Sequence, residues 1–270
     1  MTRPPKILVF DSGLGGLTVF RALKAKRPDA HFLYAADDLG FPYGLKSEND
    51  VTVCVVAAME RLIGDHAPDC VVIACNTAST LVLPRLRARW PGIPFVGTVP
   101  AIKPAAEQSR SGLVTILATP GTVSRDYTRD LIEKFAGHCE VTLVGSSRLA
   151  GLAEAFMHGE TLSDDDVARE IAPCFVAREG RRTDSVVLAC THYPLLLDVL
   201  TRLAPWPVRW IDPAPAIARR ADHVLSTRFP AKAHDGSTFA FLFTSGDAPS
   251  ERLIASLKRL LLASAPLPAG

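Results

Sequence analysis

The chain has 270 residues, of which 48% are hydrophobic and 21% are charged, and its formal net charge is +2. A chain of this length and composition can bury a large core, either as one domain or as two modest ones. The small net charge argues against a nucleic-acid partner. Its apolar runs are far shorter than the about 20 residues of a membrane span, and the N-terminus lacks the apolar core of a signal peptide. We therefore expect a cytoplasmic protein with reduced thiols and no membrane partner.

Strand-like and helix-like patterns alternate along the chain, which predicts an α/β protein with mostly parallel sheets. In the first part, the sequence predicts strands at residues 6–10, 31–35, 71–75 and 94–97, and helices that end near residues 27, 66 and 90. Ser47 and Asp50 form a capping-box pattern at the start of the helix that ends near residue 66.

The same alternation begins again near Thr98, which indicates a second, related half. Here the sequence predicts strands at residues 113–118, 141–144, 186–190, 208–211 and 239–244, and helices at 122–135, 148–157, 164–179, 216–225 and 250–262, with one more that is interrupted at Pro194. The basic cluster at residues 178–182 is expected to cap a helix and face water. We therefore expect two similar, pseudo-symmetric α/β domains, with residues 1–97 plus 208–270 in the first and residues 98–207 in the second.

Two of the predicted strands end in a cysteine within nearly the same local sequence. Cys75 lies in VVIACNTAST and Cys190 in VVLACTHYP, each after a short apolar run typical of a buried parallel strand. Polar residues follow both cysteines at once, and such strand ends line the ligand crevice of open α/β sheets. We therefore interpret these two thiols as functional, facing one cleft. The other four lie in apolar or helical stretches and are expected to be inert packing: Cys54, Cys70, Cys139 and Cys174.

Three further loops have residue types that bind ligands. They are FDSGLGG with Asp11 and Ser12, the turn FPYG with Pro42, Tyr43 and Gly44, and the helix start at Thr119 and Thr122. Amides and hydroxyls at such places favour anions. None of the three loops contains a lysine or arginine, so an anion there is expected to be held by neutral donors. A plain glycine-rich helix start and a plain turn remain alternatives for the first two.

Taken in this order and spread, these motifs resemble the glutamate racemases of the cofactor-independent aspartate/glutamate racemase superfamily, from Phe10 to about Asp212. The resemblance implies two similar α/β domains with the active site between them. It also implies interconversion of L- and D-glutamate without cofactor or metal, as a source of D-glutamate for peptidoglycan. The catalytic group that it implies is Cys75, Cys190, Asp11, His192 and Glu154. The substrate contacts that it implies are Asp11, Ser12, Pro42, Tyr43, Gly44, Asn76, Thr77, Thr119, Thr122, Thr191 and His192.

The chemistry suits this residue set, because racemisation is simplest with one acid/base on each face of a carbon. A thiol has an ordinary pKa of about 8.5, so modest tuning lets it act either as base or as acid near neutrality. The lysines have no phosphate cradle nearby, which argues against a pyridoxal phosphate aldimine. One departure from the family is Ser146-Ser147-Arg148, where a cysteine-proline pair is common.

Four alternatives remain at this point. An enzyme acting on aspartate differs by about one methylene in its substrate, and a malonate decarboxylase needs only one of the two cysteines. A zinc site at Cys75, Cys190 and His192 is disfavoured by the Cys-x-His spacing. The fourth alternative is a non-catalytic binding protein. The sequence does not fix the oligomeric state, and a homodimer is compatible with it.

Overall fold

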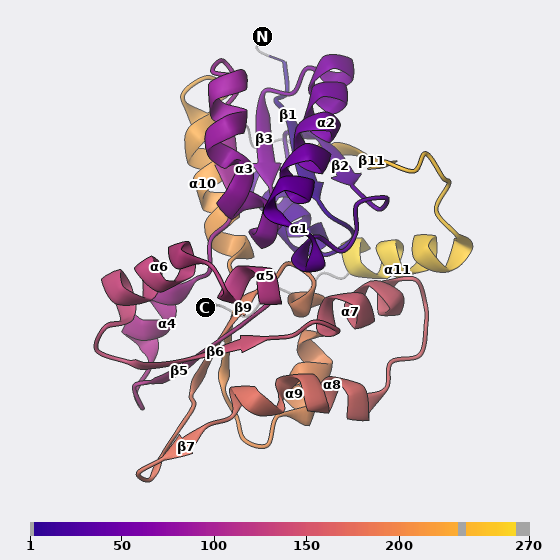
Figure 1. The fold of residues 1–270 in the computed structure, drawn as a ribbon. Coiled ribbons are helices and arrows are strands. Elements are labelled where there is room, and N and C mark those ends of the chain that lie inside the picture. The colour runs from indigo at the N-terminus through magenta and orange to yellow at the C-terminus, as the bar shows by residue number, and fades with distance from the viewer. Residues whose placement is uncertain (1–2, 232–235, 263–270) are drawn as a thin grey trace. The chain divides into compact units, whose positions relative to one another are not determined.

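The structure, a computed structural model, describes residues 3–231 and 236–262, and Figure 1 shows the order of its elements. It divides into two compact units: unit 1 contains the described residues of 1–99 and 214–247, and unit 2 contains residues 100–213 and 248–262. This division differs from the expected domains at residues 98–99, which group with unit 1, and at 208–213 and 248–262, which group with unit 2. No helix within the described ranges is long and apolar enough to cross a membrane.

Unit 1 is built on a five-stranded parallel sheet with the strand order β11-β2-β1-β3-β4. Its elements are β1 (Lys6–Asp11), α1 (Leu17–Lys26), β2 (His31–Ala36), η1 (Tyr43–Leu45), α2 (Glu48–His66), β3 (Cys70–Ile73), α3 (Asn76–Arg89), β4 (Phe95–Gly97), α10 (Ala214–Ser226) and β11 (Thr238–Phe243). The predicted cap of α2 is confirmed, because the Ser47 side chain accepts a hydrogen bond from the backbone N–H of Asp50. The edge strand β11 comes from the C-terminal part of the chain, as expected.

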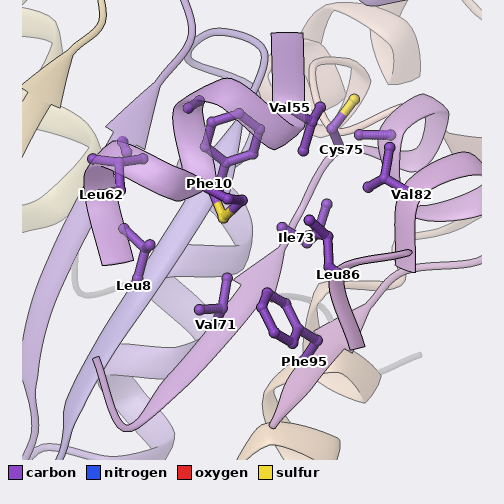
Figure 2. Packing of buried hydrophobic residues seen from close by; sticks show 14 of the residues in the cluster. Leu8, Phe10, Val55, Leu62, Val71, Ile73, Cys75, Val82, Leu86 and Phe95 are labelled. Atoms are coloured by element: carbon purple, nitrogen blue, oxygen red, sulfur yellow. The ribbon is translucent and has the colours of Figure 1, made fainter. Parts of the chain in front are cut away.

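Alternating strand residues of unit 1 face two different helix layers. Leu8 and Phe10 of β1 pack with Val71 and Ile73 of β3 against α2 and α3, as Figure 2 shows. In the same view, Cys75 lies beyond Ile73, at the end of the cluster. Helices α1 and α10 contact each other, and α10 also contacts β3 and β4. The cysteine therefore stands where the apolar core stops.

Unit 2 is built on a four-stranded parallel sheet with the strand order β10-β9-β5-β6. Its elements are α4 (Ile102–Gln108), β5 (Leu113–Ala118), α5 (Pro120–Val123), α6 (Asp126–Ala136), β6 (Glu140–Gly145), α7 (Leu149–Met157), α8 (Asp164–Ile171), η2 (Ala172–Cys174), β7 (Ala177–Arg178), β8 (Arg181–Arg182), β9 (Ser185–Ala189), η3 (Tyr193–Leu196), α9 (Leu197–Leu203), β10 (Arg209–Ile211) and α11 (Glu251–Leu262). Strand β10 pairs with β9, and α11 contacts α7, which is why both segments belong to this unit.

The helix predicted over residues 164–179 is wrong in its second half. Helix α8 ends at Ile171, the short η2 contains Pro173, and the antiparallel strands β7 and β8 follow as a hairpin. A proline removes a helical hydrogen bond and favours such an ending. The basic cluster therefore does not cap a helix: Arg178 and Arg181 bond to Glu140 of β6 instead. The helix predicted over residues 122–135 is likewise two helices, α5 and α6.

Candidate active site

Cys75 is positioned by the central part of the unit 1 sheet. Strand β3 lies between β1 and β4, and the backbone N–H of Ala74 donates to the carbonyl of Phe10 over 2.8 Å. The side chain of Cys75 is 5% exposed, and its thiol donates to Ser12 Oγ at 3.9 Å. Cys75 is also the residue directly before α3. The positive end of that helix dipole stabilises a thiolate at this position.

Asp11 lies at the end of β1, beside the Cys75 strand. It is completely buried, and its Oδ2 accepts from the backbone N–H of Gly13 at 3.3 Å. Tight packing fixes this turn, since a Cβ on Gly16 would approach the Cβ of Asp11 within 2.8 Å. The structure thus brings Asp11, Ser12 and Cys75 to one end of one sheet.

Asn76 is the first residue of α3, and its buried side-chain amide can still form hydrogen bonds. Both its Nδ2 and its Oδ1 are buried without a hydrogen-bond partner among the residues that the structure describes. Buried polar groups are almost always bonded in folded proteins, to protein, water or ligand. The neighbouring Thr77 is buried as well. Asn76 therefore has the capacity expected of a ligand-binding amide.

The carboxylate of Asp37, which the sequence analysis missed, contacts and supports the FPYG turn. The hydroxyl of Tyr43 donates to Asp37, and Thr244 Oγ1 donates to the other oxygen of Asp37 at 2.7 Å. Burial, and then the charge of Asp37, raises the pKa of Tyr43 far above its ordinary value, so the phenol stays protonated. The hydroxyl of Tyr43 is therefore committed to the fold. Pro42 and Gly44 on either side are half-buried.

Cys190 occupies the corresponding place in unit 2, directly after β9. Its sulfur is 3.9 Å from Nδ1 of His192, and Nε2 of His192 is 2.7 Å from Oε2 of Glu154 on α7. The side chains of His192 and Glu154 are 2% and 13% exposed. Thiol, imidazole and carboxylate thus form a continuous buried chain of polar contacts, and Thr191 lies buried within the same segment.

The electrostatics of this chain favour a charged imidazole. Burial alone lowers the pKa of His192, but its contacts with Cys190 and Glu154 outweigh burial and hold the pKa well above its ordinary value. A protonated imidazole in contact with the sulfur of Cys190 is suited to proton transfer with it. Glu154 in turn stabilises the imidazolium.

Thr119 and Thr122 lie at the end of β5, the strand next to β9. Their hydroxyl oxygens are 3.1 Å apart, and Thr128 Oγ1 donates to the carbonyl of Thr122 at 2.7 Å. Both threonines are buried. The structure therefore brings the predicted threonine pair to the same end of the sheet as Cys190.

The other cysteines differ from these two. Burial raises the pKa of the Cys70 and Cys174 thiols to about 12, so both stay protonated at neutral pH. Burial also raises the pKa of the Cys139 thiol. These thiols lack the polar surroundings of a reactive cysteine.

The donor atoms around Cys190 do not converge on a metal position. The two ring nitrogens of His192 face opposite partners, one the thiol and the other the carboxylate. In neither unit does the described chain gather three or more His, Cys, Asp or Glu side chains in a group that could hold a metal ion. The arrangement instead suits proton transfer.

The sequence analysis did not single out Asp37, and it noted Ser146 without predicting its bonds to several elements of unit 2. Asp37 directly follows β2, so the strand-end rule that singled out Asp11 could have found it. Ser146 donates to Glu170, which is 24 residues away in the sequence, at 2.5 Å. No local signal predicts that contact.

A family match agrees with this geometry. Residues 18–221 match the model described as Asp/Glu/Hydantoin racemase, and the chain belongs to this racemase family. Within the family, its relatives are glutamate racemases. The glutamate racemase of Agrobacterium fabrum is 56% identical over 250 residues, which is 92% of this chain and 91% of the relative. That of Sinorhizobium medicae is 57% identical over 250 residues, 92% of each chain. A crystal structure of Escherichia coli glutamate racemase, in complex with L-glutamate and the activator UDP-MurNAc-ala, is similar with a TM-score of 0.86 and 41% identity, over 96% of each chain.

Proposed function

We propose that this chain interconverts L-glutamate and D-glutamate, with Cys75 and Cys190 as its two acid/bases and with no cofactor or metal. The observation that carries the proposal is the buried chain Cys190–His192–Glu154, in a protein more than half identical to glutamate racemases over most of its length. A structural cysteine has no need of a buried imidazole with a raised pKa beside it.

The two thiols act on opposite faces of the substrate Cα in this mechanism. Cys190 is tuned by the imidazole of His192, whereas Cys75 is tuned by the α3 N-terminus, the hydroxyl of Ser12 and the carboxylate of Asp11. In this proposal, Cys75 removes the proton from D-glutamate and Cys190 from L-glutamate. One thiolate takes the Cα proton while the opposite thiol gives its own proton to the other face, so the charge moves from one sulfur to the other.

Neutral donors hold the substrate carboxylates. Asn76, Thr77 and the turn at Pro42–Gly44 lie in unit 1, and Thr119, Thr122 and Thr191 lie in unit 2. Donors aimed at a carboxylate stabilise the negative charge that develops as Cα is deprotonated. The product D-glutamate is then available for peptidoglycan synthesis, and loss of the enzyme creates a requirement for it.

The test is circular dichroism of the purified, chelator-treated and dialysed protein with either enantiomer of glutamate, and separately of aspartate. We expect racemisation of glutamate in both directions and little change with aspartate. Cys75→Ser and Cys190→Ser should each lose several orders of magnitude in turnover, whereas Cys139→Ser, the matched control, should keep it. Activity that appears only after zinc or pyridoxal phosphate is added, or a clear preference for aspartate, contradicts the proposal.

A further inference from the structure

Ser146 lies between β6 and α7, is only 3% exposed, and has no place in the proposed reaction. Its backbone N–H donates to the carbonyl of Ala118 at 2.8 Å, directly before Thr119. Its hydroxyl accepts from the N–H of Leu149, the first residue of α7, at 3.0 Å and donates to Oε2 of Glu170 on α8 at 2.5 Å. Its carbonyl accepts from the hydroxyl of Tyr193, the residue after His192, at 3.5 Å. One serine thus contacts three segments that carry candidate site residues.

We propose that Ser146, held by Glu170, is a positioning residue that fixes α7 so that Glu154 meets His192. This inference rests on the proposed function for its kinetic consequence, but its structural part concerns only the contacts around Cys190. Neither Ser146 nor Glu170 is proposed to contact the sulfur of Cys190, the imidazole of His192 or the substrate. Their effect passes through Glu154.

The position of Glu154 depends on how the first turn of α7 is held. Helix α7 has nine residues, and Arg148 directly before it makes no side-chain capping bond. Ser146 provides a side-chain acceptor for the first turn instead. Glu154 lies five residues after Leu149, which is about 7.5 Å along the helix axis. A small rotation or slide at the start of so short a helix moves the Glu154 carboxylate out of its 2.7 Å contact with His192.

Two links join the start of α7 to α8, and they differ in burial. The Ser146–Glu170 bond is half-buried, whereas Arg148 forms an ion pair with Asp166 at 3.2 Å with its side chain 50% exposed. Exposed ion pairs are weak and screened by salt, so the Ser146–Glu170 bond contributes more than the ion pair to the register of the two helices. The hydroxyl of Ser146 both donates and accepts, so it joins the first turn of α7 to α8.

The test compares Ser146→Ala with two matched controls. Ser163→Ala removes another serine that caps a helix, the one before α8, where Ser163 Oγ accepts from the N–H of Asp166. Arg148→Met removes the exposed link between the same two helices. A second pair, Glu170→Ala and Glu170→Gln, removes the half-buried acceptor in the first case and keeps an acceptor oxygen in the second.

Two measurements are made on the full chain. The first is kcat and KM for both glutamate enantiomers across pH. The second is the rate of Cys190 alkylation by iodoacetamide, followed by mass spectrometry of its peptide, which needs no turnover. A misplaced Glu154 lets the imidazole of His192 move away from the Cys190 sulfur, so the thiol loses the group with which it exchanges a proton. We expect Ser146→Ala and Glu170→Ala to lower kcat and Cys190 alkylation at pH 7 about 10-fold with little change in KM. Glu170→Gln and both controls should stay within about twofold of the starting protein, since they leave the α7 contact in place.

The outcomes separate this inference from the proposed function. If glutamate is not racemised at all but Ser146→Ala still slows alkylation of Cys190, the positioning role stands and the proposed reaction falls. If Ser146→Ala lowers stability as much as Ser163→Ala while kcat and alkylation are unchanged, Ser146 is only a helix cap and the inference is overturned. Should Ser146→Ala fail to fold, the contrast between Glu170→Ala and Glu170→Gln decides, and equal behaviour of those two overturns it.

Discussion

Replacing Glu154 tests the Cys190 group most directly, because Glu154 contacts His192 and not the sulfur. Its carboxylate is 13% exposed and lies 2.7 Å from Nε2 of His192. A hydrogen bond to a charged group contributes about 1.5–3 kcal/mol, and a neutral bond contributes about half as much. Glu154→Gln keeps the shape and an acceptor oxygen but removes the charge, a loss of about 0.75–1.5 kcal/mol, or roughly 4- to 13-fold in turnover. Glu154→Ala loses the whole contact, which predicts about 10- to 150-fold.

The assay is the pH dependence of kcat for racemisation, followed by circular dichroism. The pKa of His192 is raised in the intact protein, and removing the negative charge lowers it. The proposed mechanism uses the protonated imidazole, so activity should be lost as pH rises through this pKa, and the alkaline limb should move to lower pH in both variants. Glu160→Gln changes an exposed residue just beyond α7 and is the control. It should change neither kcat nor the position of the alkaline limb. A rise in KM at constant kcat, or an alkaline limb that stays in place, would show that Glu154 does not act through His192.

Three further predictions concern the thiols and the stability of each unit. Offered a glutamate analogue with a β-leaving group, which needs only one base, Cys75→Ser and Cys190→Ser should eliminate from opposite enantiomers, and a shared preference refutes the two-base assignment. Arg27 is fully buried and paired with two carboxylates, so Arg27→Met should cost about 3–5 kcal/mol in urea unfolding. Lys26→Met, which breaks an exposed pair with one of the same carboxylates, should cost at most about 1 kcal/mol. Equal losses of unfolding free energy in Arg27→Met and Lys26→Met would show that burial of the pair does not matter. Burial raises the pKa of Asp184, but hydrogen bonds from the turn before β5 outweigh it and lower the pKa; Asp184→Asn should therefore cost about 1.5–3 kcal/mol at neutral pH. That cost should shrink as pH falls through the lowered pKa, below about 4, and a cost that is independent of pH contradicts this assignment.

The sequence predicted the cysteine strands because a strand core and a reactive strand end have different compositions. Apolar runs stop at Ala74 and at Ala189, and polar residues follow, so both the buried strands and their ends can be located locally. Predicting the contacts from Cys190 to Glu154 required the family resemblance. The two residues are far apart in sequence, and their approach depends on how α7 packs.

What the sequence did not predict depends on tertiary contacts. The stretch after α8 has a helical pattern, yet Pro173 and a turn at Gly180, where φ is +76°, convert it into a hairpin. The position of Asp37, directly after β2, follows the strand-end rule, but its contact with the hydroxyl of Tyr43 in the FPYG turn depends on tertiary packing. Ser146 looks like an ordinary loop serine until α8 brings Glu170 beside it. Side chains that act through another side chain leave no periodic or compositional trace.

The pairing of β11 with β2 sets the order in which unit 1 can be completed during synthesis. Thr238 pairs with His31 across 207 residues of chain. At a translation rate of about 5–20 residues per second, the ribosome needs roughly 10–40 s to make the intervening segment. Throughout that time the outer edge of β2 has unpaired backbone groups, the kind of edge that recruits foreign strands. A nascent chain stalled before residue 238 therefore exposes an open sheet edge, and we expect chaperones to bind it there until β11 emerges.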